Sequence, residues 1–380
     1  MGYCKKSHLG RNAMSMQTLF AGLVKIPSYS GHEHAVAAFI MDWARIQDIK
    51  AQLQNGNVLL QFISSSNKAL IFNAHMDTVK PGNENLWIYP PSGKDAGVTM
   101  NGKLYGLGAS DDKAAIAAFL CLAIQLQKTP PPIDVIIVFV ANEEVDGSGS
   151  QSFVNYFQKK YAHTYKDVAA VLGEPTDLNT IEIGHRGNIF IKVTTSGDTG
   201  HGSQPQNIKT HAIMENINAI EKITTLGKSL SEMYSDPVLG KPSFCLTGIQ
   251  SDASSPNTVS SGCSSTWDIR TTPNVHSKVV SLIQKTLGKH VEITHLGEPA
   301  PFGITAPDSK IVRLLQKLVP DVKVAVSPGS NDICAFTSAA IPAVAFGPGQ
   351  KDTIHKPNEY VQLHKVIDAV DLYKQLIYSW

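Results

Sequence analysis

The chain has 380 residues, of which 42 % are hydrophobic and 17 % charged, and its formal net charge is +1. This length favours two domains over one compact core, and the composition is that of an ordinary globular protein. So small a net charge offers no field for capturing nucleic acid or an anionic membrane, and neither partner is expected.

No apolar run approaches the roughly 18 residues that a transmembrane helix needs, and Met1 to Ser15 lacks the apolar stretch of a secretory signal. The five cysteines are widely spread and include no Cys-x-x-Cys pair. Neither a disulfide framework nor a thiolate zinc site is therefore expected. These features predict a cytoplasmic protein.

The first half of the chain alternates predicted helices and strands. In chain order these are a helix over residues 35–46, strands over 57–63 and 69–73, a helix over 113–127, and strands over 133–141 and 168–172. The run over 133–141 is almost unbroken in apolar residues and rich in β-branched ones, which fits a parallel sheet covered on both faces. The alternation predicts an α/β fold with a doubly wound, mostly parallel sheet.

The predicted order of helices and strands changes between about residues 184 and 298. The predicted order is a strand over 189–195, a helix over 211–226, strands over 244–250 and 264–270, and a helix over 277–287. These five elements are in the order of a β-α-β-β-α-β pattern up to its last strand, and they predict an inserted ferredoxin-like α+β domain. A helix over 309–318, a strand over 343–346 and a closing helix over 365–378 follow. We therefore predict one domain from residues 1–184 and 299–380, and an inserted domain of residues 185–298.

Acidic and imidazole side chains follow several predicted strands of the first domain. His75 and Asp77 follow the strand over 69–73, Glu143 and Glu144 follow the strand over 133–141, and Glu174 follows the strand over 168–172. Open parallel sheets bind their ligands beyond the carboxyl ends of the strands. These side chains are therefore expected to meet at one edge of the sheet.

Each motif also has an ordinary structural interpretation. In an extended segment His75 and Asp77 point the same way, so Asp77 can orient a metal-bound His75 or simply cap a loop. Asp111 and Asp112 lie in a glycine-rich turn that enters a helix, where aspartate favours N-capping. Two adjacent carboxylates are costly there unless a cation offsets them. One of the two can cap the helix while the other binds metal.

The paired acids Glu143 and Glu144 end the most hydrophobic strand of the chain. Their side chains diverge in an extended segment, so one can bind metal while the other acts as a general base on a water; a polar turn is the alternative. Glu174 and His355 lie close to prolines, which favour extended or turned backbone. Together, two histidines and four or five carboxylates are the ligand inventory of a two-metal hydrolytic site.

The order of these motifs resembles the di-zinc amidohydrolase and exopeptidase family of acetylornithine deacetylase, succinyl-diaminopimelate desuccinylase, aminoacylase and the glutamate-releasing carboxypeptidase. The resemblance extends from about Leu19 to Val361 and rests on six segments: 74–78, 106–113, 142–144, 173–176, 199–203 and 354–357. It implies two Zn²⁺ ions as cofactors, with Co²⁺ or Mn²⁺ as possible substitutes.

The resemblance implies a role for each matching residue of the first domain. His75 and Glu174 hold one zinc, Glu144 and His355 hold the second, and Asp111 bridges the two. Asp77 orients His75, and Glu143 is the general acid and base.

The insert resembles the lid and dimerisation domain of the family, which implies a homodimer. His201 matches a histidine that stabilises the oxyanion and that reaches the partner's active site in family dimers, although a lone loop histidine is more often only solvated. Asn257 and Arg270 match residues that hold the substrate carboxylate. The backbone around Gly329 and Ser330 matches a loop that contacts it.

The chain departs from the family pattern without losing a ligand. Leu107 stands where arginine is usual, Asp112 replaces a common methionine, and Val259-Ser260 replaces an Ile-Pro pair. The segment Asp111-Asp112-Lys113 is similar to the aminotripeptidase branch. We therefore expect zinc-dependent hydrolysis of the amide bond of an N-acyl amino acid. A metallo-exopeptidase acting on short peptides and a catalytically retired metal-binding protein are the alternatives.

Overall fold

The computed structural model describes residues 15–161 and 163–380. The segment from Met1 to Ser15, in which no secretory signal is expected, therefore falls almost wholly outside the described residues. The chain divides into two compact units. The first consists of residues up to Ile183 together with Thr305–Ala325 and Ala335–Trp380, and the second consists of Gly184–Ile304 and Val326–Cys334.

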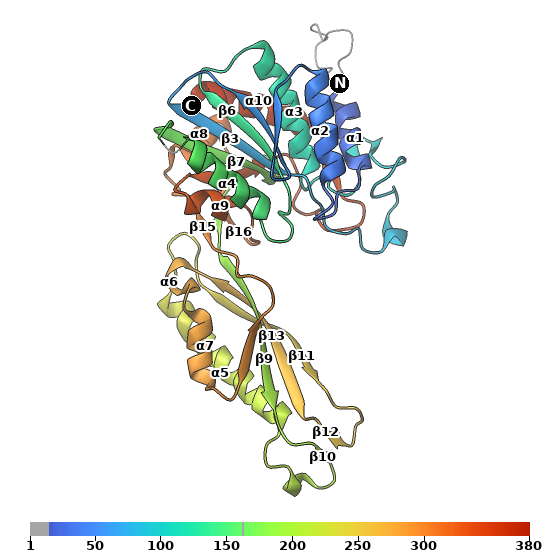
Figure 1. Ribbon diagram of the computed structural model, residues 1–380, viewed down its shortest axis with the longest axis vertical. Helices are drawn as coiled ribbons and strands as arrows, with labels where there is room; N and C mark the ends of the chain where they lie inside the picture. The colour runs from blue at the N-terminus through green and yellow to red at the C-terminus, as the bar shows by residue number, and fades with distance from the viewer. Residues whose placement is uncertain (1–14, 162) are drawn as a thin grey trace. The chain divides into compact units, whose positions relative to one another are not determined.

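A central sheet organises the first unit (Figure 1), although β15 and the last residues of β8 and β16 are grouped with the second unit. Its strand order is β1-β2-β6-β3-β7-β17-β8-β15, and β16 also pairs with β8. The strands are β1 (Ala51–Gln54), β2 (Asn57–Phe62), β3 (Lys68–His75), β6 (Asp134–Val140), β7 (Asp167–Pro175), β8 (Thr180–His185), β15 (Gly303–Ile304), β16 (Lys323–Ser327) and β17 (Ala343–Gly347). The central pairs β6–β3, β3–β7 and β7–β17 are parallel, whereas β1–β2 and β2–β6 are antiparallel.

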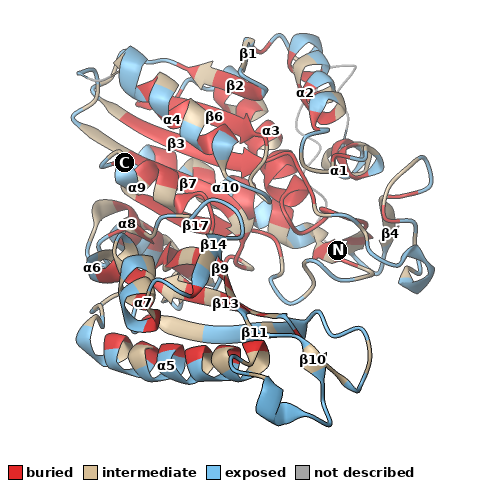
Figure 2. Ribbon diagram, turned by 60° about the horizontal axis from the view of Figure 1, so that its bottom comes forward, coloured by how far each residue is buried: buried red, intermediate tan, exposed pale blue. Residues whose placement is uncertain are grey.

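The middle strands of this sheet are buried, and helices cover it (Figure 2). The helices are α1 (Met16–Lys25), α2 (His34–Ile46), α3 (Lys113–Lys128), α4 (Ser148–Tyr161), α8 (Lys310–Leu318), α9 (Ile333–Ser338) and α10 (Leu363–Ser379). Phe72 of β3 contacts Phe119 of α3 and Tyr373 of α10, with ring centroids 5.4 Å apart in each case. This aromatic cluster fixes the central strand three residues before His75.

Two small elements complete the first unit. A three-stranded sheet has the order β18-β5-β4, formed by β4 (Val98–Met100), β5 (Lys103–Tyr105) and β18 (Tyr360–Gln362). The 3-10 helix η1 spans Glu84–Leu86. Since β18 directly follows Glu359, its pairing with β5 brings the region after His355 beside the turn that begins at Gly106.

The second unit is a separate antiparallel sheet with the order β11-β13-β9-β14. Its elements are β9 (Gly187–Ser196), α5 (Ala212–Met233), β11 (Ser243–Ser251), β13 (Gly262–Thr271), α6 (Pro273–His276), α7 (Val279–Leu287) and β14 (Glu292–His295). Alternate residues of β13 are buried, and Trp267 packs with Ile223 of α5 and Ile283 of α7 in one core. The order of elements is ferredoxin-like. The predicted fold class, a mostly parallel sheet with an inserted α+β unit, is confirmed.

Candidate metal centre

His75 is the last residue of β3, and its ring is buried. Its Nε2 lies 2.9 Å from Asp111 Oδ1. On the other side of the ring, Nδ1 lies 3.0 Å from the Asp77 carbonyl oxygen and 3.4 Å from Asp77 Oδ1. Burial alone would lower the pKa of His75, but Asp111 and Asp77 raise it well above its ordinary value. The ring therefore lies in a strong carboxylate field.

Asp77 connects this ring to the paired glutamates. Its carboxylate accepts hydrogen bonds from the backbone N–H groups of Glu143 and Glu144, both at 3.1 Å, and from Ser30 Oγ at 2.8 Å. Burial would raise the pKa of Asp77, but the bonds from His75, Ser30 and Glu144 lower it below its ordinary value. One ionised carboxylate thus orients the imidazole ring of His75 and holds the backbone of the segment that carries Glu143 and Glu144.

The turn from Gly106 to Asp112 presents Asp111, and its backbone is held by a residue that sequence reasoning missed. Glu359 accepts backbone N–H bonds from Gly108 (3.0 Å), Ser110 (2.7 Å) and Asp111 (3.0 Å). The peptide bond between Asp111 and Asp112 is cis. Burial and the charge of Asp111 raise the pKa of Glu359 to about 8, although the three N–H groups lower it. A cation at Asp111 would oppose that rise because it offsets the repulsion.

Asp112 does not act as the helix cap that its position suggests. It occupies the N-cap of α3, yet its side chain makes no capping hydrogen bond. Both carboxylate oxygens are buried and have no hydrogen-bond partner among the described residues. Burial, with Asp111 and Glu144 nearby, raises the pKa of Asp112 well above its ordinary value.

The remaining predicted ligands converge on the same place. His355 Nε2 lies 3.0 Å from Glu144 Oε1 and 3.6 Å from Asp111 Oδ2. One donor atom each from His75, Asp111 and Glu144 lie within 4.8 Å of one another, and the same holds for His75, Glu143 and Glu174. Glu174 lies inside β7 rather than after it, because that strand continues to Pro175.

These residues fit a pair of divalent cations. Histidine nitrogens and carboxylate oxygens are common ligands of zinc, and they also suit cobalt and manganese. The unpartnered oxygens of Asp112 and the crowding of acids around His75 are the kind of imbalance that bound cations would offset. Asp111 directs one oxygen to each histidine, which is the arrangement that a bridging carboxylate requires.

The other predicted site residues belong to the second unit. Asn257 Nδ2 lies 3.4 Å from His201 Nε2, beside the pairing of β10 (Gly200–His201) with β12 (Thr258–Val259). Arg270 donates two hydrogen bonds to Asp268, at 2.7 and 3.0 Å. Ser330 has a buried hydroxyl with no partner among the described residues, and its neighbour Gly329 is exposed.

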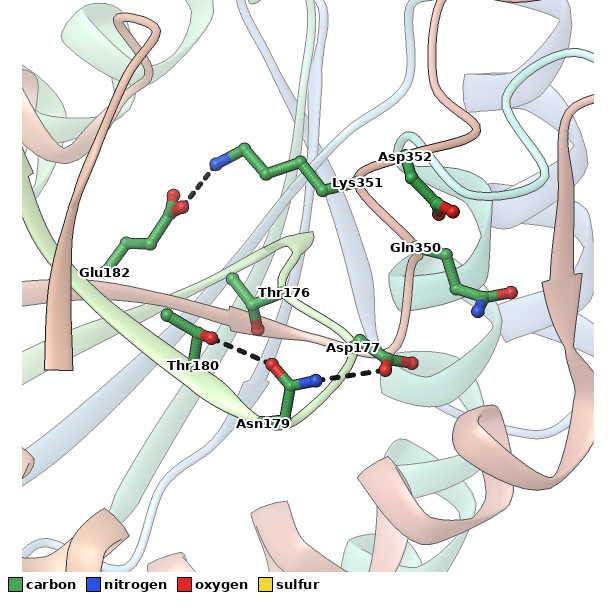
Figure 3. A pocket seen from close by; sticks show the side chains of 8 residues that line it. All are labelled: Thr176, Asp177, Asn179, Thr180, Glu182, Gln350, Lys351 and Asp352. Carbon is green, nitrogen blue, oxygen red and sulfur yellow. Dashed lines mark hydrogen bonds and ion pairs between the residues drawn. The ribbon is translucent and has the colours of Figure 1, made fainter. Parts of the chain in front are cut away.

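Two pockets lie near the predicted ligands of the first unit. The pocket in Figure 3 holds about 320 Å³. It is lined by Thr176, Asp177 and Asn179 of the turn after β7, by Thr180 and Glu182 of β8, and by residues 350–352. Lys351 and Glu182 form an ion pair in it, and none of the predicted ligands lines it. A second pocket of about 240 Å³ is lined by His355 and the two residues after it, by residues 79–83, and by Leu86, Trp87 and Leu107. No helix of the described residues is long and apolar enough to cross a membrane.

Comparison with known proteins gives a consistent set of relatives. The sequence profile of peptidase family M20/M25/M40 matches residues 71–379. A probable succinyl-diaminopimelate desuccinylase of Staphylococcus epidermidis is 23 % identical, and the match covers 95 % of this chain and 96 % of that protein. An acetylornithine deacetylase of Buchnera aphidicola is 27 % identical, with coverage of 84 % and 82 %.

Solved structures share the fold at lower identity. A Staphylococcus aureus tripeptidase has a TM-score of 0.77 at 20 % identity, covering 96 % of this chain and 98 % of that one. A dinuclear metal-binding peptidase of Bacillus subtilis has a TM-score of 0.67 at 13 % identity, with coverage of 96 % and 97 %.

Proposed function

We propose that this chain, which belongs to peptidase family M20/M25/M40 and is a metallohydrolase acting on C–N bonds, removes the acyl group from an N-acyl amino acid. Its membership confirms the family resemblance that the six motifs indicate. The metallohydrolase part of the proposal rests on the convergence of His75, Asp111, Glu144, Glu174 and His355 around one point of the first unit. The acyl substrate is supported by the relatives that are named desuccinylase and deacetylase.

Five residues would hold two metal ions, and two-metal centres are typical of the family. His75 and Glu174 would hold one ion, Glu144 and His355 the other, and Asp111 would lie between them. When bound, the ions would polarise the amide carbonyl and lower the pKa of a water. Zinc is the ion proposed, with cobalt or manganese as substitutes.

Glu143 is proposed as the general base. One of its oxygens lies within 4.8 Å of donor atoms of His75 and Glu174, and its backbone N–H is held by Asp77. From this position the carboxylate can take a proton from the attacking water and return it to the leaving amine. Asp77 holds His75 by its Nδ1 edge, which leaves Nε2 directed at Asp111.

The second unit is proposed to stabilise the oxyanion, to hold the substrate carboxylate and to form a homodimer. His201 would donate to the developing oxyanion, and Arg270, Asn257 and the Gly329-Ser330 backbone would hold the carboxylate. If His201 acts across the dimer, mixing Glu143→Ala with His201→Ala protein should restore activity, because a mixed dimer holds one complete site. A monomeric mass with full activity would contradict this.

A metallo-exopeptidase is the second candidate, and the segment Asp111-Asp112-Lys113 favours it. The deciding experiment measures hydrolysis of acetylornithine, succinyl-diaminopimelate and several short peptides by the zinc-loaded protein. Release of a carboxylic acid from the N-acyl amino acids supports the first proposal. Cleavage of peptides alone would replace it with the exopeptidase. Zinc uptake with no hydrolysis of either class would indicate a retired binding protein.

A further inference from the structure

The pocket beside His355 differs in chemistry from the metal centre next to it. Its walls are mainly apolar side chains of the first unit, and no carboxylate lines it. They are Val79, Pro81, Leu86, Trp87, Leu107 and Pro357. His355 contributes one wall while its Nε2 faces Glu144, so the pocket opens directly beside the candidate metal ligands.

Hydrogen bonds hold two of the three chain segments that line this pocket, those around Trp87 and Pro357. Asn358 accepts from the Ile88 backbone N–H at 2.6 Å, and its amide donates to the Leu86 carbonyl oxygen at 3.0 Å. Trp87 Nε1 donates to the Pro81 carbonyl oxygen at 3.0 Å. The indole N–H is therefore satisfied within the loop, and the apolar part of the ring is available to line the pocket. A site built in this way needs little ordering when a ligand binds.

Two lysines line the pocket, and the head of one of them, Lys356, is engaged outside it. Lys80 and Lys356 are both exposed, and the Lys356 ammonium donates to the Asp352 carbonyl oxygen at 2.8 Å. A lysine whose head is engaged elsewhere covers an apolar surface with its stem. Leu107 is 4 % exposed and stands where the family commonly has arginine, so this wall is apolar in the present chain.

We infer that this pocket holds the acyl chain of the substrate and that the preferred acyl group is an unbranched or aromatic apolar group larger than acetyl. The inference rests on the proposed function. The residues proposed for the substrate carboxylate belong to the second unit, which leaves the acyl half for this apolar pocket. Its volume of about 240 Å³ is many times the roughly 10–15 Å³ that a cavity needs, by the same measure, to hold one water molecule. A methyl group would leave most of that volume unfilled.

The first test compares chain lengths on one amino acid, using N-acetyl, N-butyryl and N-hexanoyl derivatives of whichever amino acid the screen selects. Each methylene moved from water into the pocket should raise kcat/KM about fourfold, equivalent to about 0.8 kcal/mol. Leu107→Arg and Trp87→Ala should reduce that dependence to less than twofold per methylene. Ile88→Ala is the matched control, because Ile88 is 77 % exposed and does not line the pocket.

The second test measures binding without turnover. Acetate, butyrate and hexanoate are titrated into the zinc-loaded protein by calorimetry, and affinity should rise with chain length in the wild type and in Ile88→Ala. Leu107→Ala joins the series as a milder change, and circular dichroism verifies that each variant is folded. A flat or falling series in both tests would overturn the inference while leaving the proposed function standing. If the carboxylates bind as expected but only peptides are cleaved, the proposed function fails and the apolar pocket is retained.

Discussion

Glu359 is predicted to control metal affinity without touching the metal. It is buried, with 1 % exposure, and accepts three backbone N–H bonds from the turn that presents Asp111. Glu359→Gln keeps the size of the side chain and one carbonyl oxygen, which can still accept from Ser110 and Asp111. The amide nitrogen then faces the Gly108 N–H, so one buried donor loses its partner.

The expected loss of zinc affinity follows from the number of backbone N–H groups that lose their partner. A buried donor left unpaired costs about 1–3 kcal/mol, and residues that support metal ligands from outside typically change metal affinity about 10–100-fold. Glu359→Gln should therefore weaken zinc binding by about one order of magnitude. Glu359→Ala, which leaves three donors unpaired, should weaken it by about two or more. The loss arises because Asp111 is no longer held in place.

The assay is competition for zinc against a chromophoric chelator, with urea unfolding of the metal-free protein measured in parallel. Glu221→Gln, an exposed glutamate of α5, is the matched control and should behave as wild type. Zinc affinity in Glu359→Ala equal to that of the wild type would refute the reasoning. If Glu359→Ala lowers the free energy of unfolding of the metal-free protein but leaves zinc affinity unchanged, Glu359 supports the fold only.

Three further predictions follow from the same site and from the second unit. Glu143→Ala should bind zinc normally but lose about 10²–10⁴-fold in kcat; loss of a metal ion instead would make Glu143 a ligand. Asp77→Asn should weaken zinc binding about 10–100-fold, and unchanged affinity by the same competition assay would remove Asp77 from the site. His185 is buried, and burial with the charge of Arg270 lowers its pKa below the ordinary 6.5. The unfolded chain therefore binds the proton more readily, so stability is complete above pH 6.5 and falls below it. Urea midpoints at pH 7.5 and 5.5 should differ less in His185→Gln, and an equal difference in both proteins would contradict this.

The strands that carry the site could be predicted because their apolar runs are long and continuous. The strand expected over 69–73 was found as Lys68–His75, longer because His75 pairs with Val140 in the parallel ladder. The strand expected to end before Glu174 continues through it for the same kind of reason, since Pro175 still pairs with Gly347 after a register shift in the ladder. Pattern alone locates a strand, but its partners decide where it ends.

Other features depend on contacts that no local pattern contains. The helix that begins at Ser148 looks like a turn in sequence, because two glycines flank its first residue. A Cβ at Gly149 would lie 2.1 Å from the Ala141 carbonyl oxygen, so glycine is required there by close packing. The role of Glu359 arises from backbone N–H groups about 250 positions earlier in the chain. In the sequence, the only indication of this role is that Glu359 lies shortly after His355 and just before the strand β18.

Anomalous diffraction from crystals of the zinc-loaded protein, recorded on both sides of the zinc absorption edge, would locate the bound metal ions. We expect two peaks, one contacted by His75 and Glu174 and one by Glu144 and His355, with an Asp111 oxygen at each. A single peak, or two peaks without Asp111 between them, would contradict this expectation.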